Sequence, residues 1–275
     1  MANEAFLRLA SSRTLKTYIS MFGLFKSFRR RSILNQPMPA GWNQFLADLY
    51  HYDLLDGQQK EGLHRRMKII VAEKNWEGCE GLEITEQMKV TIAAQCSIML
   101  LGVDPSFYYD KLTTILVYPN VIERKRREVK GMIETNEKQI LVGEAWQGGP
   151  VILSWAEILD DRFHARDHRN LVVHEFAHHL DGMDGEMGGT PPLESLAATR
   201  HWLAVFGAAY DEMVLQLKHG ISTFLDPYGA TSPAEFFAVS SECFFMAPQE
   251  LRTAMPDVYQ QLCGFYKQDP TTWNT

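Results

Sequence analysis

The chain has 275 residues, of which 45% are hydrophobic, and its formal net charge is −7 at pH 7. The hydrophobic content is enough for a packed core, so we expect a globular protein of one large or two small domains. The acidic balance argues against nucleic acid as the main partner, and two short basic runs, at residues 29–31 and 124–127, are expected to be solvated surface. No apolar stretch approaches the roughly 18 residues that a membrane span requires. Four cysteines without a C-x-x-C spacing indicate reduced, mostly buried thiols. Since the sequence also shows neither a membrane span nor a secretory signal, it predicts a cytoplasmic protein.

The first 40 residues are polar and basic, and Pro37 and Pro39 interrupt them near their end. They lack the unbroken apolar segment and the small-residue cleavage site of a secretory signal. We therefore expect an arm or a peripheral helix over residues 1–40 and a folded domain over residues 41–275. Met21 is an alternative start of the protein.

The first part of the folded domain, residues 42–100, is expected to be largely helical, and Thr85 is expected to begin a helix that stops at Gly102. The hydrophobic period then changes, and short apolar or β-branched runs predict strands at 113–118, 139–142 and 151–155. These strands would form a small sheet.

Two helices are expected in the C-terminal part of the chain. Residues 193–219 form one long amphipathic stretch that closes at Gly220. Ser232 and Pro233 have the residue types preferred at the N-cap and the first position of a helix. The predicted fold class is α+β, mainly helical, with a small sheet ahead of a zincin-type active-site helix.

The segment from His174 to His178 has the pattern H-E-x-x-H. In a helix, positions i and i+4 lie one turn apart and within about 40° of each other, so both imidazoles can bind one metal ion. Glu175 would lie beside the ion, where its carboxylate could take a proton from a water whose pKa zinc lowers to roughly 7. Apolar residues surround the motif, Asp167 can serve near the helix start, and Gly182 is a suitable stop. The motif predicts a buried zinc-hydrolase helix, and the alternative is a pair of hydrogen-bonded core histidines.

A catalytic zinc usually has three protein ligands and one open position, so a third ligand is needed. In one arrangement it follows the first histidine by ten residues, at Asp184, but the glycine required at the seventh position is here Asp181. In another arrangement it is a glutamate of a later helix, for which Glu235 is the candidate, although Ser232 and Glu235 also make a capping box. Glu242, two turns later, is a second-choice ligand or an acceptor for a ligating histidine, a role that Asp181 could also fill. The residues alone leave this choice open.

Two segments together carry a resemblance to a known family. HEFAHHLD and the run from Tyr228 to Ala238 resemble the Mlc titration factor A family of bacterial zinc peptidases, and the second segment also resembles the catalytic domain of anthrax lethal factor. The resemblance runs from about Trp42 to the C-terminus. It implies one zinc ion per chain, bound by His174, His178 and Glu235, with Glu175 as the general base and Tyr228 stabilising the oxyanion. A phenol near the metal can donate to that oxygen as its charge develops.

The resemblance implies a zinc-dependent metallopeptidase, an aminopeptidase or short-peptide hydrolase, that also binds and titrates the glucose repressor Mlc. The alternative is a repressor-sequestering protein with a latent or secondary zinc site, for which residues 256–266 and the basic arm are the surface candidates. Residues 143–155 are expected to offer an exposed strand to an extended peptide. A zinc-stabilised structural domain is a third reading, but such sites favour four protein ligands and leave no role for Glu175. The expected partners are peptides and the repressor, with no direct nucleic acid and no membrane.

Overall fold

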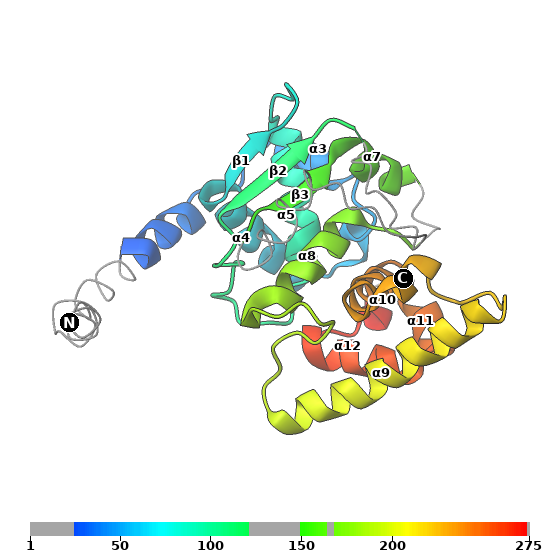
Figure 1. Ribbon diagram of the computed structural model, residues 1–275. Coiled ribbons are helices and arrows are strands. Elements are labelled where there is room, and N and C mark those ends of the chain that lie inside the picture. The colour runs from blue at the N-terminus through cyan, green and yellow to red at the C-terminus, as the bar shows by residue number, and fades with distance from the viewer. Residues whose placement is uncertain (1–24, 121–148, 164–167, 274–275) are drawn as a thin grey trace, which may run out of the picture. The chain divides into compact units, whose positions relative to one another are not determined.

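The computed structural model describes residues 25–120, 149–163 and 168–273 (Figure 1). The chain divides into two compact units, Met1–Ala40 and Gly41–Thr275, and each is described by itself. In the first unit, residues 25–35 are helical. The assignment of these units to an arm and a peptidase domain remains a prediction.

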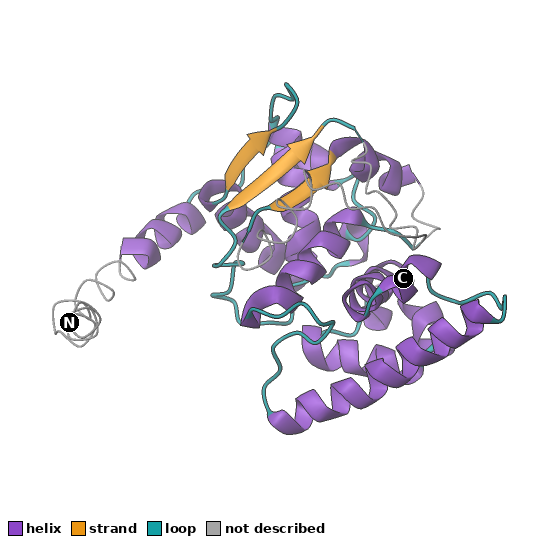
Figure 2. Cartoon of the chain, in the orientation of Figure 1, coloured by secondary structure: helices purple, strands orange, loops and turns teal. Residues whose placement is uncertain are grey.

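The second unit confirms the α+β class, because helices predominate around one small parallel sheet (Figure 2). Its described α-helices are α3 (Trp42–Leu46), α4 (Gly57–Glu73), α5 (Glu86–Ile98), α7 (Trp155–Phe163), α8 (Leu171–Asp181), α9 (Leu196–Lys218), α10 (Pro233–Met246), α11 (Pro248–Ala254) and α12 (Pro256–Tyr266). The strands are β1 (Asn75–Gly78), β2 (Thr114–Tyr118) and β3 (Val151–Ser154). Short 3-10 helices are η1 (Tyr52–Leu54), η3 (Gly182–Asp184), η4 (Pro227–Thr231) and η5 (Pro270–Thr272).

The sheet has the order β1-β2-β3, and both pairings are parallel. β2 lies in the middle and alternates buried and half-buried residues, as its β-branched sequence predicts. β1 contradicts the expectation of helix through residues 42–100. Its four residues have little apolar content and only Trp76 is even half-buried, so the strand depends on its pairing with β2 and leaves no local signal. The strand expected at 139–142 lies outside the described residues.

Helix α5 lies at the centre of the fold, against α3, α4 and α8. The side chain of Thr85 accepts a hydrogen bond from the backbone N–H of Met88 and so caps its start, as expected. Every residue from Val90 to Ile98 is buried. The helix ends at Ile98 and not at Gly102, which instead lies so close to the backbone of Lys267 that no side chain would fit.

The loop between α5 and β2 is held by two buried cations, Arg66 in α4 and Lys74 directly after it. Arg66 donates to the carbonyl oxygens of Leu100 and Val103, at 2.6 and 2.8 Å. Lys74 donates to the carbonyl oxygens of Tyr109 and Leu112, at 2.6 and 2.9 Å. Because buried cations need such partners, the loop is fixed, and it places the ring of Tyr109 against Phe176 of α8, with ring centroids 4.7 Å apart.

Aromatic side chains join α9 to α10. The ring of Trp202 stacks on Phe206 at 4.0 Å between centroids and meets Phe237 edge-on at 5.6 Å. The long helix expected at 193–219 is confirmed as α9, which is three residues shorter at its start and one residue shorter at its end. Cys96 and Cys243 are free and buried, as expected.

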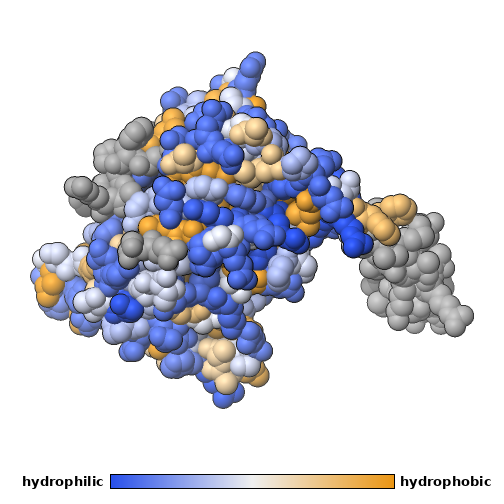
Figure 3. Space-filling view, turned by 180° about the vertical axis from the view of Figure 1, so that it is seen from behind, coloured by the Kyte–Doolittle hydropathy of each residue, from blue (hydrophilic) through white to orange (hydrophobic). Residues whose placement is uncertain are grey.

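The described surface is mixed in polarity. On the face opposite to that of Figure 1, hydrophilic residues predominate and hydrophobic ones are scattered in small groups (Figure 3). Among the described residues, no helix combines the length and apolar character needed to cross a membrane.

Candidate metal centre

The helix that carries H-E-x-x-H is α8, and its start is held by three side chains. Asn170 is the N-cap, and its Oδ1 accepts from the N–H of Val173 at 3.0 Å. Asp161 of α7 accepts from the N–H of Leu171 at 2.7 Å, and Glu242 of α10 accepts from the N–H of Asn170 at 2.6 Å. Asp167, which was expected near this start, lies outside the described residues. Gly182 follows as the C-cap, as expected.

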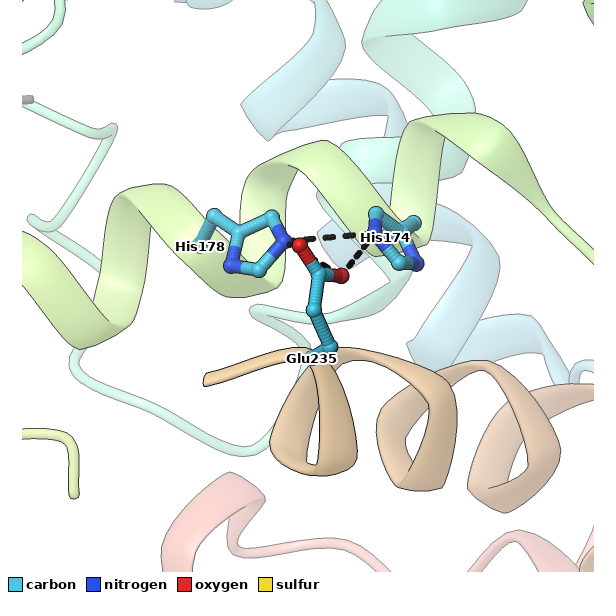
Figure 4. A group of neighbouring side chains, drawn as sticks. All are labelled: His174, His178 and Glu235. Carbon is cyan, nitrogen blue, oxygen red and sulfur yellow. Dashed lines mark hydrogen bonds and ion pairs between the residues drawn. The ribbon is translucent and has the colours of Figure 1, made fainter. Parts of the chain in front are cut away.

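Three side chains converge between α8 and α10. His174 and His178 reach out from successive turns of α8, and Glu235 points up to them from the first turn of α10 (Figure 4). Oε2 of Glu235 lies 3.0 Å from Nε2 of His174 and 3.2 Å from Nε2 of His178, and the two Nε2 atoms are 3.2 Å apart. Among the described residues this group could hold a metal ion.

The spacing of these atoms fits a shared metal ion as well as it fits hydrogen bonds. Nitrogen and oxygen ligands at 2.0–2.1 Å from a tetrahedral ion lie about 3.3 Å from one another, close to the separations found here. Nδ1 of His174 donates to Glu242, so neutral His174 turns the lone pair of Nε2 toward the carboxylate of Glu235. Two electron-rich atoms so close together require a cation between them, either a proton or a metal.

The electrostatics of the group point the same way. Burial opposes a charged imidazole, but Glu242 and Glu235 outweigh it and raise the pKa of His174 to about 10. Burial likewise opposes the charged form of Glu235, but hydrogen bonds with His174 and His178 hold its pKa well below the usual range. The site therefore favours a carboxylate together with bound positive charge.

Glu242 is placed as a partner of a histidine and not within the group of three. Its Oε1 accepts from Nδ1 of His174 at 2.7 Å, and its side chain is only 9% exposed. Since the proton then lies on Nδ1, the Nε2 atom is left to face the centre. Of the two roles considered for Glu242, the geometry favours the acceptor.

The other candidates for third ligand are accounted for differently. Asp184 is exposed in η3, where its Oδ1 accepts from the N–H of Glu186, and it is not part of the converging group. Asp181 accepts from the N–H of Gly189 at 2.8 Å. Half of the expected capping box is present, because Ser232 accepts from the N–H of Glu235 at 3.2 Å. The Glu235 carboxylate, however, is directed to the histidines.

Tyr228 lies beside the converging group, and Glu175 is within electrostatic reach of His174. Glu175 is buried on α8, next to His174 in sequence. The hydroxyl of Tyr228, in η4, lies 3.2 Å from Oε1 of Glu235, and its ring centroid is 6.0 Å from that of His174. Sequence reasoning missed Asp161 and Asn170, although the cap residue type of Asn170 directly before the motif helix was a usable signal.

Comparison with known proteins places the chain in a family. The family model of the glucose-regulated metallo-peptidase M90 matches residues 25–267. The chain belongs to this M90 family. The match starts before Trp42, so residues 25–40, which the resemblance left uncovered, are part of it.

Relatives of the M90 chain are similar over nearly their whole length. Mlc titration factor A of Klebsiella pneumoniae is 34% identical over 246 residues, which are 86% of this chain and 88% of the relative. The protein of that name from Escherichia fergusonii is 30% identical over 242 residues, with the same coverage of 86% and 88%. An uncharacterized protein of Synechocystis is 35% identical over 258 residues, which are 92% of this chain and 93% of the relative. The chain is thus a member of a metallopeptidase family, and this membership suggests a metal cofactor.

Proposed function

We propose that the chain is a zinc-dependent peptidase whose ion is bound by His174, His178 and Glu235. The observation that carries this proposal is the convergence of two Nε2 atoms and a carboxylate oxygen at 3.0–3.2 Å from one another. Two imidazoles and one carboxylate, with a fourth position open, form a donor set typical of catalytic zinc. Among the described residues, neither Cys96 nor Cys243 belongs to the group, which speaks against a closed structural site.

The chemistry divides between the ion and the side chains around it. When bound, zinc supplies Lewis acidity toward the substrate carbonyl and makes water a stronger nucleophile at neutral pH. Glu175 takes the proton of the attacking water and passes it to the leaving amine. Tyr228 exchanges its present contact with Glu235 for a hydrogen bond to the oxygen on which negative charge develops.

An extended peptide would reach this site along β3. Among the described strands, β3 pairs only with β2, and it packs against α8. An unpaired strand edge can bind a peptide backbone through its N–H and C=O groups, with side chains alternating between the two faces. The part of the expected strand before residue 149 lies outside the described residues. We propose short peptides as substrates, with removal of N-terminal residues as the reaction, in the cytoplasm.

The test is hydrolysis of aminoacyl anilides and short peptides by zinc-loaded protein, run beside Glu175→Gln. The variant should retain zinc, because Glu175 is not a proposed ligand. Its turnover should fall by about 10²- to 10⁴-fold. Glu186→Gln, the same change at an exposed residue shortly after α8, is the matched control and should behave as the parent. Turnover of Glu175→Gln at the parental rate, with equal zinc content, would contradict the proposed mechanism.

A second candidate function is binding of the repressor Mlc, which is favoured by the name of several relatives, Mlc titration factor A. One candidate surface is the outer side of α12, where Asp257 and Gln260 are exposed. Binding of purified Mlc by parent and by Glu175→Gln separates the two functions. Equal binding would make repressor binding independent of peptide hydrolysis, whereas loss of binding would couple them, and no binding by the parent would remove this candidate.

A further inference from the structure

The loop between η3 and α9 is anchored through the backbone of one residue, Gly189. Its N–H donates to Oδ2 of Asp181, the last residue of α8, at 2.8 Å. Its carbonyl oxygen accepts from Nε1 of Trp202, in α9, at 2.9 Å. Asp181 and Trp202 are 0% and 1% exposed, so both anchors are buried and these hydrogen bonds are shielded from water.

The third side of Gly189 lies against the start of α10. A Cβ atom at Gly189 would lie 2.2 Å from the carbonyl oxygen of Pro233 and 2.5 Å from its carbonyl carbon. These are backbone atoms, which cannot move aside as a flexible side chain can. Gly189 also has φ +73°, a conformation that residues with a Cβ rarely adopt. Only glycine allows the loop to pass this close to α10.

Pro233 is two residues before Glu235, so this contact bears on the metal group. Helices α8 and α10 run antiparallel, because Glu242, late in α10, contacts the start of α8, while the end of α8 is joined through Gly189 to the start of α10. Glu242 therefore fixes one end of the helix pair. Gly189 is the contact at the other end, nearest to Glu235.

We propose that Asp181, Gly189 and Trp202, here called the Gly189 clasp, set the separation of α8 and α10 and thereby position the Glu235 carboxylate for the metal. The inference rests on the proposed zinc site and adds positioning residues to it. None of the three belongs to the converging group, although the charge of Asp181 acts on His178. Their effect passes through the backbone of Pro233 and Ala234 to Glu235, and it should vanish when Glu235 no longer acts as a ligand.

The experiment measures Zn²⁺ affinity by competition with a chromophoric chelator, for parent, Gly189→Ala and Gly188→Ala. Gly188 is the matched control, since it is the neighbouring glycine, is exposed, has nothing within 4 Å of an added Cβ and has no positive φ. We expect Gly189→Ala to bind Zn²⁺ about 10- to 100-fold more weakly, as is usual when support of a metal ligand is lost. Gly188→Ala should stay within about twofold of the parent.

A double-mutant cycle with Glu235→Gln distinguishes positioning from general damage. In that background Gly189→Ala should cause no further loss of Zn²⁺ affinity. Equal losses in both backgrounds, or parental affinity of Gly189→Ala, would overturn the inference. A parent that binds no Zn²⁺ would instead contradict the proposed function, and the inference with it.

If Gly189→Ala does not fold, the same cycle is run with Asp181→Ala, which removes the acceptor of the Gly189 N–H. Asp181→Asn keeps an acceptor oxygen and should restore most of the affinity. A loss that is equal in Asp181→Ala and Asp181→Asn would assign the effect to the charge of Asp181 and overturn the clasp.

Discussion

Replacing Glu242 by Gln is expected to weaken zinc binding about 10- to 100-fold. The carboxylate accepts two hydrogen bonds at once, from Nδ1 of His174 at 2.7 Å and from the N–H of Asn170 at 2.6 Å. Glutamine has one acceptor oxygen, so its NH₂ group must face one of these two donors. With a side chain 9% exposed, little water is present to compensate.

The magnitude follows from the strength of such bonds. A hydrogen bond to a charged group contributes about 1.5–3 kcal/mol, and each 1.4 kcal/mol is a factor of ten in affinity. Only the part of this hydrogen-bond free energy that differs between metal-bound and metal-free protein changes the zinc affinity. The largest such part is the preference of Glu242 for the His174 tautomer that leaves Nε2 without a proton.

The assay is chelator competition with Zn²⁺ at a fixed pH near 7.5, together with thermal unfolding of the metal-free proteins. Glu250→Gln, at an exposed residue of α11, is the control and should bind zinc as the parent does. Parental zinc affinity in Glu242→Gln would refute the idea that this carboxylate orients His174. A lower melting temperature without an affinity change would assign Glu242 to the fold alone.

Three further outcomes are expected. Burial, opposed by a hydrogen bond with the backbone of Phe245, lowers the pKa of His51 to about 4 from 6.5, so the folded protein keeps His51 neutral where the unfolded chain binds a proton. This contribution to the unfolding free energy is complete above pH 6.5 and is lost as the pH falls toward 4, about 3 kcal/mol in all. In urea titrations across this range, the unfolding free energy of the parent should fall with pH, and that of His51→Gln should fall less. An equal pH dependence in the two proteins would argue against this role of His51. Phe237→Ala should cost about 3–5 kcal/mol of unfolding free energy, because Phe237 is fully buried, whereas Phe224→Ala, at 39% exposure, should cost far less; equal costs in denaturant titrations would contradict the packing described. Free zinc at 1,000 times its Kd should stabilise the parent by about 4 kcal/mol over the chelator-treated protein, and Glu235→Gln should gain much less at the same zinc concentration in calorimetry; an equal gain would exclude Glu235 as a ligand.

Sequence reasoning worked where the signal is local. The motif helix, the alternating strand β2 and the Ser232-Pro233 start of α10 each depend on residues within one or two turns. β1 could not be found in this way, since Asn75 to Gly78 are held by pairing with a strand almost 40 residues away in sequence. The stabilisation of these residues as a strand comes from their pairing with β2.

The candidate site divides along the same line. H-E-x-x-H names two histidines and a glutamate because they share one helix, but the direction of the Glu235 carboxylate is a tertiary fact. A capping box and a metal ligand require the same residue at the same position, so sequence alone could not choose between them. The carboxylate of Glu242 lies against His174 only because α10 packs antiparallel to α8, and the need for glycine at position 189 depends on the backbone of Pro233.

The enclosure of α5 has a consequence for the lifetime of the metal centre. Amide protons of a helix buried from Val90 to Ile98 can exchange with water only when the surrounding helices separate, so α5 should be among the last elements to open. Since α8 packs directly on α5, the two histidines are attached to this slowly opening part of the fold. Glu235 lies on α10, which is buried from Phe236 to Met246 and packs directly on α8, so the third side chain of the group is enclosed as well. Release of a bound metal ion should therefore require separation of these helices, and not only the opening of a surface loop.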